Sequence, residues 1–165
     1  MHATRHALAA IVLAAGLGVC GKPDTRPGTL VGDAYIVTEG GQEVSLAALP
    51  VALIPDTPQI DTALAAVCPR AASPAQGPDS AAQGQAWRQR NQVLSARARQ
   101  SATTDAAAHF SIAGVAPGKY RVWADTSYGG ARWTWLAPVT VKPADTTKVA
   151  LSNANPDDNP FRCKE

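Results

Sequence analysis

The chain has 165 residues, of which 45% are hydrophobic, 17% are charged and 5% are aromatic. This length predicts one domain, and 13 glycines with 13 prolines are too few for a collagen-like or wholly disordered chain. Fifteen basic side chains against thirteen acidic ones leave a net charge of only +2. So small a charge argues against nucleic acid as a partner of the whole chain.

The N-terminal segment predicts export from the cytoplasm. Arg5 and His6 precede an apolar run of about 13 residues, from Ala7 to Val19, whereas a helix needs roughly 20 residues to cross a bilayer. A short basic start followed by such a run is typical of a signal peptide. We place the signal peptide at residues 1–19 and exclude it from the fold.

The end of this run, Leu17-Gly18-Val19-Cys20, resembles the bacterial lipobox. The resemblance implies cleavage before Cys20, lipidation of that cysteine and a lipid anchor in the membrane. Gly21 after the cysteine implies sorting to the outer membrane. The alternative is ordinary cleavage after Gly16 or Gly18, which would give a soluble periplasmic or secreted protein.

The cysteine count agrees with an exported lipoprotein. The chain has three cysteines, Cys20, Cys68 and Cys163. Lipidation of Cys20 would leave Cys68 and Cys163 as an even pair in an oxidising compartment, so we predict a disulfide between them. The alternative is that both remain free thiols.

The mature chain begins with a predicted tether at residues 20–28, which contains prolines and charges, and continues as one predicted domain at 29–165. Short runs with strand character start at Thr29 and are separated by turn residues. The first of these runs are Leu30–Val37, Val44–Leu46 and Pro50–Ile54.

A helical insertion is predicted at about residues 57–100. Ile60, Leu64 and Val67 recur at helical spacing, residues 69–85 read as a loop, and residues 86–100 are rich in helix formers. Trp87, Leu94 and Ala98 share one stripe of this second helix. Its other face carries four arginines with no acidic residue nearby: Arg88, Arg90, Arg97 and Arg99. We interpret them as a solvated face, with contact to anionic lipid headgroups as the alternative.

Strand patterns return after Ser101 and continue to Leu151. Phe110 and Ile112 alternate with polar neighbours, so one face of this strand is expected to point inward. Pro117-Gly118 predicts a type II turn, and residues 126–132 are expected to form a loop. Trp133 to Lys142 and Thr147 to Leu151 are the last predicted strands. Together these elements predict a mainly β protein, a β-sandwich with an α-helical insertion.

The segment from Thr103 to Ala124 resembles the carboxypeptidase regulatory-like domain, a family similar to transthyretin and the collagen-adhesin B repeats. The matching residues are Phe110, Val115, Pro117, Gly118, Tyr120 and Val122. The resemblance spans Thr29 to Leu151 around the helical insertion and implies a Greek-key β-sandwich. It implies little about activity, because such domains serve as add-on domains, surface stalks and glycan-associated modules.

The chain offers few residues for chemistry, so we expect no catalytic residues, no cofactor and no metal. His109 is the only histidine after the signal peptide, and we interpret it as an exposed residue at a strand edge. Asp157-Asp158, flanked by asparagines, are interpreted as a solvated turn, with calcium binding as the alternative.

The aromatic residues of the last third are the candidate ligand-binding set. Trp133 and Trp135 lie two apart, so in a strand they share a face with Val139 and Val141, and we expect that face to be core. The alternative is a bulge near Pro138 that turns both rings outward as a stacking platform. Trp123 is expected to be exposed in either case. The candidate set is Trp123, Tyr128, Trp133 and Trp135.

These features together predict a non-catalytic lipoprotein of the bacterial cell envelope. Its sandwich is expected to act as a scaffold or protein-interaction module for an envelope protein that the sequence does not identify. The alternative is a carbohydrate-binding module for envelope or extracellular glycans, based on the candidate aromatic set.

Overall fold

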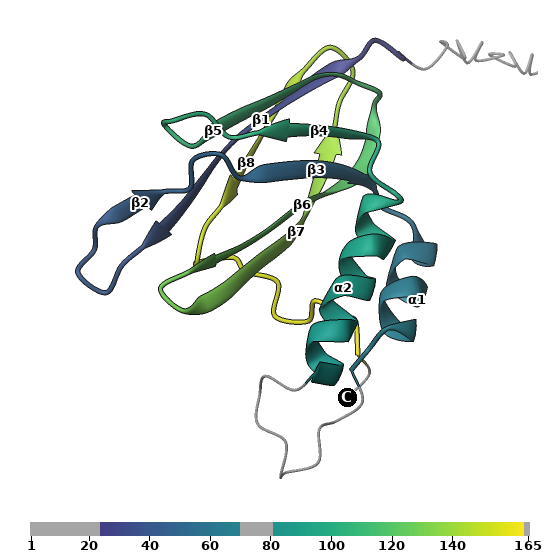
Figure 1. Ribbon diagram of the computed structural model, residues 1–165. Coiled ribbons are helices and arrows are strands. Elements are labelled where there is room, and N and C mark those ends of the chain that lie inside the picture. The colour runs from purple at the N-terminus through teal and green to yellow at the C-terminus, as the bar shows by residue number, and fades with distance from the viewer. Residues whose placement is uncertain (1–23, 70–80, 164–165) are drawn as a thin grey trace, which may run out of the picture.

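The computed structural model describes residues 24–69 and 81–163. Two β-sheets pack face to face, and two helices lie outside one of them (Figure 1). The predicted fold class is therefore confirmed: a mainly β, Greek-key sandwich with an α-helical insertion. Within the described residues, neither helix is long and apolar enough to cross a bilayer. The predicted signal peptide and Cys20 lie outside the described residues.

The first sheet is built around β1 (Gly28–Val37). This strand pairs antiparallel with β2 (Glu43–Ser45) and β5 (His109–Val115), and parallel with β8 (Thr146–Leu151). The second sheet is antiparallel throughout, in the order β4-β3-β6-β7. Its strands are β3 (Pro50–Pro55), β4 (Gln100–Thr103), β6 (Gly118–Tyr128) and β7 (Ala131–Val141).

The main core lies between the two sheets and follows the alternation of each strand. On β1 the inward positions are apolar while Asp33 points outward, and on β5 Phe110 and Ile112 point inward while Ser111 points outward. Trp135 of β7 is the largest side chain in this core and is completely buried. Other buried members of this core include Leu30, Ala34, Ile36, Val51, Leu53, Phe110, Ile112, Val122, Ala124 and Leu151.

A second, smaller core lies on the outer face of the second sheet, beneath α1 (Pro58–Ala66) and α2 (Ala81–Ser95). Residues 51–54 of β3 are buried in an unbroken run because the main core covers one side of the strand and the helices cover the other. Pro58 suits the first turn of α1, where its missing N–H costs no hydrogen bond. The members of the second core are Ile54, Ile60, Leu64, Leu94 and Leu136.

The second helix differs from its predicted bounds at both ends. Residues 81–85, expected in a loop, are helical, and α2 ends at Ser95 rather than near Gln100. The helix stops early because the chain turns to pair with β3: the Arg99 N–H donates to the Leu53 carbonyl at 2.9 Å, and β4 begins at the next residue. Sheet pairing thus overrides the helix-forming composition of residues 96–100.

Two turns also differ from the sequence prediction. Residues 126–132 do not form a loop. Strand β6 ends at Tyr128 and β7 begins at Ala131, so only Gly129 and Gly130 join them. Both glycines have positive φ (60° and 77°), as a two-residue hairpin turn of the primed type requires. The prediction of a type II turn at Pro117-Gly118 is also wrong, because Gly118 does not have a positive φ. The positive φ of this region falls on Gly114, at the register shift where β5 carries one extra residue opposite β1.

Candidate functional site

The four candidate aromatic residues do not meet on one surface. Trp135 lies in the main core, where its indole N–H donates to the Ser152 carbonyl at 2.9 Å. Trp133, half-buried, packs against the same core. Tyr128 is exposed at the hairpin tip. A stacking platform that includes Trp135 is therefore not present, because the ring of this residue has no solvent-exposed face.

Trp123 corrects another expectation, since it is not an exposed indole. It alternates with Val122 and Ala124 and thus points to the outer face of the second sheet, as predicted. That face is covered by the helices, and Trp123 packs against the second core beneath them. The alternation in the sequence predicted the correct side of the strand for Trp123. It did not indicate that helices cover that side.

A disulfide joins Cys68 to Cys163, with the two Cα atoms 5.5 Å apart. Cys68 lies just beyond α1, and Cys163 lies in the C-terminal tail, which we define as residues 152–163. The bond fastens this tail over the helical side of the sandwich. Phe161 of the tail is buried and contacts Trp87 of α2 edge to face, with ring centroids 4.9 Å apart.

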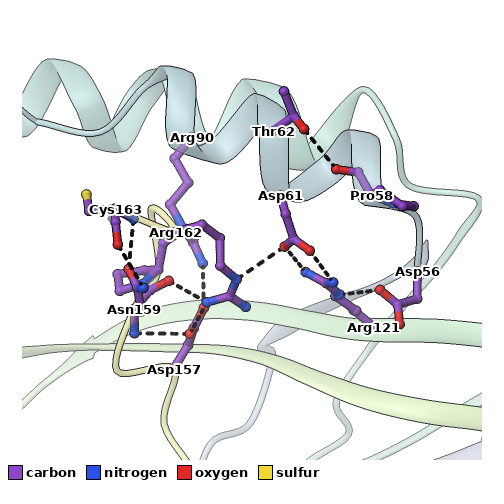
Figure 2. Close-up of polar contacts among 11 residues, drawn as sticks. Asp56, Pro58, Asp61, Thr62, Arg90, Arg121, Asp157, Asn159, Arg162 and Cys163 are labelled. Carbon is purple, nitrogen blue, oxygen red and sulfur yellow. Dashed lines mark hydrogen bonds and ion pairs between the residues drawn. The ribbon is translucent and has the colours of Figure 1, made fainter. Parts of the chain in front are cut away.

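Figure 2 shows that a network of arginines and aspartates lies between the helices and the second sheet. Arg121 of β6 donates from Nε to Asp56 at 2.7 Å and from both terminal nitrogens to Asp61 of α1, at 2.5 and 2.9 Å. The hydrogen bond from Arg121 lowers the pKa of Asp61, and the same contact raises the pKa of Arg121. Arg162 of the tail also reaches Asp61, at 3.4 Å.

The second half of the network centres on Asp157 of the tail. Its carboxylate accepts a hydrogen bond from Arg162 at 2.7 Å and lies 3.7 Å from Nη2 of Arg90. Arg90 is completely buried and donates to the Pro160 carbonyl at 2.8 Å and to Thr134 at 3.0 Å. Burial lowers the pKa of Arg90 to about 10, an effect that the nearby carboxylate of Asp157 partly offsets.

This network corrects two interpretations of the sequence. Arg90 does not belong to a solvated arginine face: it points into the protein, and acidic partners come from the tail. Asp157 is not part of a solvated turn, since its carboxylate is nearly buried between two guanidinium groups. Arg97 folds back to donate to the Val93 carbonyl, which leaves Arg88 and Arg99 as the exposed members of the predicted set.

The outer face of the second sheet, here called the covered face, is therefore closed by α1, α2 and the tail. The outer face of the first sheet, here called the open face, has no such cover among the described residues (Figure 1). A groove of about 630 Å³ crosses the open face over β8, β1 and β5. Its lining is contributed by Val31, Gly32, Asp33, Thr103, Asp105, His109, Phe110, Ser111, Lys148, Val149 and Ala150.

Polar side chains of the groove come from four strands and one turn. The Nδ1 atom of His109 contacts the carboxylate of Asp33, which lies on the neighbouring strand β1. Both side chains are more than half exposed. Asp105 is held in place because its Oδ1 accepts backbone N–H groups of Ala107 and His109, both at 2.9 Å. Lys148 of β8 adds a positive charge. The groove thus presents both acidic and basic side chains on a sheet.

The open-face groove contains both a hydroxyl and an imidazole side chain. Ser111 lies two residues from His109 on the same face, but no hydrogen bond joins them in the described part of the chain. A nucleophile needs a base within hydrogen-bonding reach. Sequence analysis had singled out His109 alone, and the register of β1 against β5 is what places Asp33 beside it.

Comparisons with known proteins find similar solved structures but no family. No family model and no curated protein sequence matches the chain. A solved structure from Pseudomonas aeruginosa, described as a "putative" carbohydrate binding protein, is similar over 79% of this chain and 90% of its own, with 20% identity and a TM-score of 0.47.

Two further solved structures are similar over about the same part of this chain. The minor pilin GBS52 of Streptococcus agalactiae has 18% identity and a TM-score of 0.45 over 78% of this chain. A DUF3823 family protein of Parabacteroides merdae has 19% identity and a TM-score of 0.36. This chain spans 44% of the pilin and 46% of the second protein.

Proposed function

We propose that the chain is an exported lipoprotein of the bacterial cell envelope, anchored through Cys20, whose sandwich is a non-catalytic scaffold or protein-interaction module. The proposal includes the division into a signal peptide (1–19), a tether (20–28) and a domain (29–165). It also includes the resemblance to the carboxypeptidase regulatory-like domain, whose hairpin corresponds to β5 and β6.

The observation that carries the proposal is the Cys68–Cys163 disulfide. A structural disulfide is typical of proteins that fold in an oxidising compartment. With three cysteines in the chain, this pairing leaves Cys20 as the remaining thiol, at the end of the predicted signal peptide. One cysteine is thus available for lipidation while the other two close the covered face.

The same arrangement supports binding on the open face. The disulfide-fastened tail and the helices occupy the outer side of the second sheet, so a partner of the sandwich is offered the groove that contains Asp33, His109 and Lys148. The rigid strands beneath these side chains hold them in fixed positions, as a binding surface requires.

The proposal is tested by expressing the full chain in a Gram-negative host with a radiolabelled fatty acid. We expect the wild-type protein to carry the label and to sediment with membranes, and Cys20→Ala to lose both. The Cys68→Ala/Cys163→Ala variant is the matched control, since it removes cysteines but should still be labelled. Equal solubility and labelling of wild type and Cys20→Ala would contradict the anchor.

The interaction role has its own test. A photoreactive amino acid is placed at Ser111 on the open face or at Arg88, which is exposed on α2 above the covered face. Protein adducts specific to Ser111 support the module. Equal adducts at both positions contradict a partner on the open face. The carbohydrate alternative now depends on the groove alone, and specific retention on purified peptidoglycan that Lys148→Glu abolishes would favour it instead.

A further inference from the structure

One end of the sandwich gathers the start of the described chain and several turns. We call it the proximal end, and it comprises residues 24–28, the turns at 115–118 and 142–145, and the junction of Arg99 with β4. Gly28 pairs with Val115, and Thr29 donates to the Asp145 carbonyl at 2.9 Å. Figure 1 shows β1 entering beside the β7–β8 turn, while the β1–β2 and β6–β7 hairpins lie at the other end.

A pocket of about 430 Å³ opens at the proximal end between β4, β5 and β6. Its charged lining residues are Arg99 and Lys119, and none of the described residues that line it is acidic. Neither cation forms an ion pair with any residue that the structure describes. Tyr120 lines the pocket as well, with its hydroxyl fixed by donation to the Ala116 carbonyl at 2.9 Å.

The acids near this pocket already have partners. Asp56 accepts from Arg121 at 2.7 Å. Asp24 accepts from Arg26, a contact that lowers the pKa of Asp24 to about 2. Asp145 accepts the N–H of Thr146 at 2.7 Å, and the exposed Lys142 lies in the same turn. The proximal end therefore keeps a positive excess, carried by the unpaired Arg99 and Lys119.

The opposite end has the opposite character. Glu39 and Glu43, the glutamates within the described residues, both lie in the β1–β2 hairpin. The long axis of the sandwich thus runs from a basic proximal end to an acidic distal end. A negatively charged surface would attract the first end and repel the second.

The length of the tether brings the proximal end close to any membrane that holds Cys20. Asp24 is four residues after Cys20, and four residues span at most about 14 Å when fully extended. Electrostatic attraction extends over a Debye length of about 8 Å at physiological ionic strength. The reach of these four residues is longer than the Debye length, so a bent tether can bring the proximal end within the range in which headgroup charge acts on it.

We infer that the proximal end docks on the phosphate groups of an anionic phospholipid bilayer, with Arg99 and Lys119 as the contacting cations. The inference rests on the proposed anchor at Cys20 and adds an orientation to it. The sandwich stands end-on, and the acidic β1–β2 hairpin faces away from the membrane. Each such cation near an anionic leaflet is expected to strengthen the attraction about fivefold.

The test uses the purified full-length lipoprotein reconstituted in phosphatidylcholine vesicles, with or without phosphatidylglycerol. Lysines are acetylated under limiting reagent and quantified by mass spectrometry. We expect Lys119 and Lys142 to be acetylated several-fold more slowly when phosphatidylglycerol is present, and Lys148 on the open face to be unaffected. High salt should abolish the difference, because headgroup attraction is screened.

Variants separate docking from the anchor itself. Arg99→Gln should weaken the attraction about fivefold, and Lys119 and Lys142 should then lose protection. The matched control Arg88→Gln, which changes an exposed arginine of α2, should retain it. Equal labelling of Lys119 in both vesicle types, or unchanged protection in Arg99→Gln, would overturn the inference.

Two further outcomes are distinguished by the same samples. If the intact mass shows no lipid on Cys20, the proposed anchor is wrong, and the labelling is repeated with vesicles added to the soluble protein. Protection of Lys119 there supports docking, and unaltered labelling overturns it. If inorganic phosphate protects Lys119 without vesicles and phosphatidylglycerol vesicles do not, the pocket takes a free anion and the inference is overturned.

Discussion

The outer faces of the two sheets differ although both sheets contribute to one core. The covered face has a second apolar cluster, a buried arginine and a disulfide-fastened tail over it. The open face carries a polar groove whose only ion pair is between two exposed side chains, His109 and Asp33, among the residues described. The helical insertion therefore closes the outer face of one sheet, and the outer face of the other sheet stays uncovered by the described residues.

The largest effect should come from the shared core. Trp135→Ala should lower the free energy of unfolding by about 3–5 kcal/mol, because this fully buried ring would leave a cavity. The measurement is chemical denaturation of the purified domain. Trp135→Phe compared with Trp123→Phe gives the matched pair. Only Trp135 donates a hydrogen bond to a described residue, Ser152, so its Phe variant should be the less stable.

Removal of the disulfide should have the next largest effect and act on the covered face. Cys68→Ala/Cys163→Ala opens a connection between residues 95 apart, which should cost about 2–4 kcal/mol. Hydrogen exchange should show the loss of protection concentrated in the tail and α2 rather than in β1 and β5. Uniform loss over both sheets would show that the two faces do not differ in this way.

The ion pair between Arg90 and Asp157 should contribute more to the free energy of unfolding than the pair between His109 and Asp33 on the open face. Asp157→Asn should cost about 1.5–3 kcal/mol, because hydrogen bonds to charged groups are lost and Arg90 stays buried with a weaker partner. The double variant Asp157→Asn/Arg90→Met should recover part of this loss. Denaturant midpoints of the three proteins provide the check, and no recovery in the double variant would contradict the account.

The smallest effect is expected on the open face. Asp33→Asn breaks the contact with His109, but both side chains are more than half exposed, so the change should be about 0–1 kcal/mol. Thermal melting of this variant beside Asp157→Asn sharpens the contrast between the faces. A larger loss in Asp33→Asn than in Asp157→Asn would reverse the comparison.

Local patterns predicted much of the fold because they are set by neighbouring residues. Alternation on β5 gave Phe110 and Ile112 an inward direction, and counting cysteines paired Cys68 with Cys163. The helical spacing of Ile60 and Leu64 likewise marked the buried side of α1. In each case the signal lies in spacing or number, and neither needs knowledge of the rest of the chain.

The candidate site was less predictable because its members meet only through pairing and packing. Asp33 and His109 are brought together by the register of β1 against β5, for which the sequence carries no local signal. Trp123 and Arg90 were expected to be exposed and are shielded, Trp123 by the helices and Arg90 by the tail.

By itself, the sequence determined which residues of each strand share a face, that a helical pair interrupts the sheets, and which two cysteines bond. The tertiary structure decided which of the two sheets would be covered, and therefore that Arg90 is buried while His109 stays at the surface. The physical reason is that alternation gives a side chain its direction from the backbone alone. Burial depends on what other segments pack against that direction, and here those segments come from the helical insertion and the C-terminal tail.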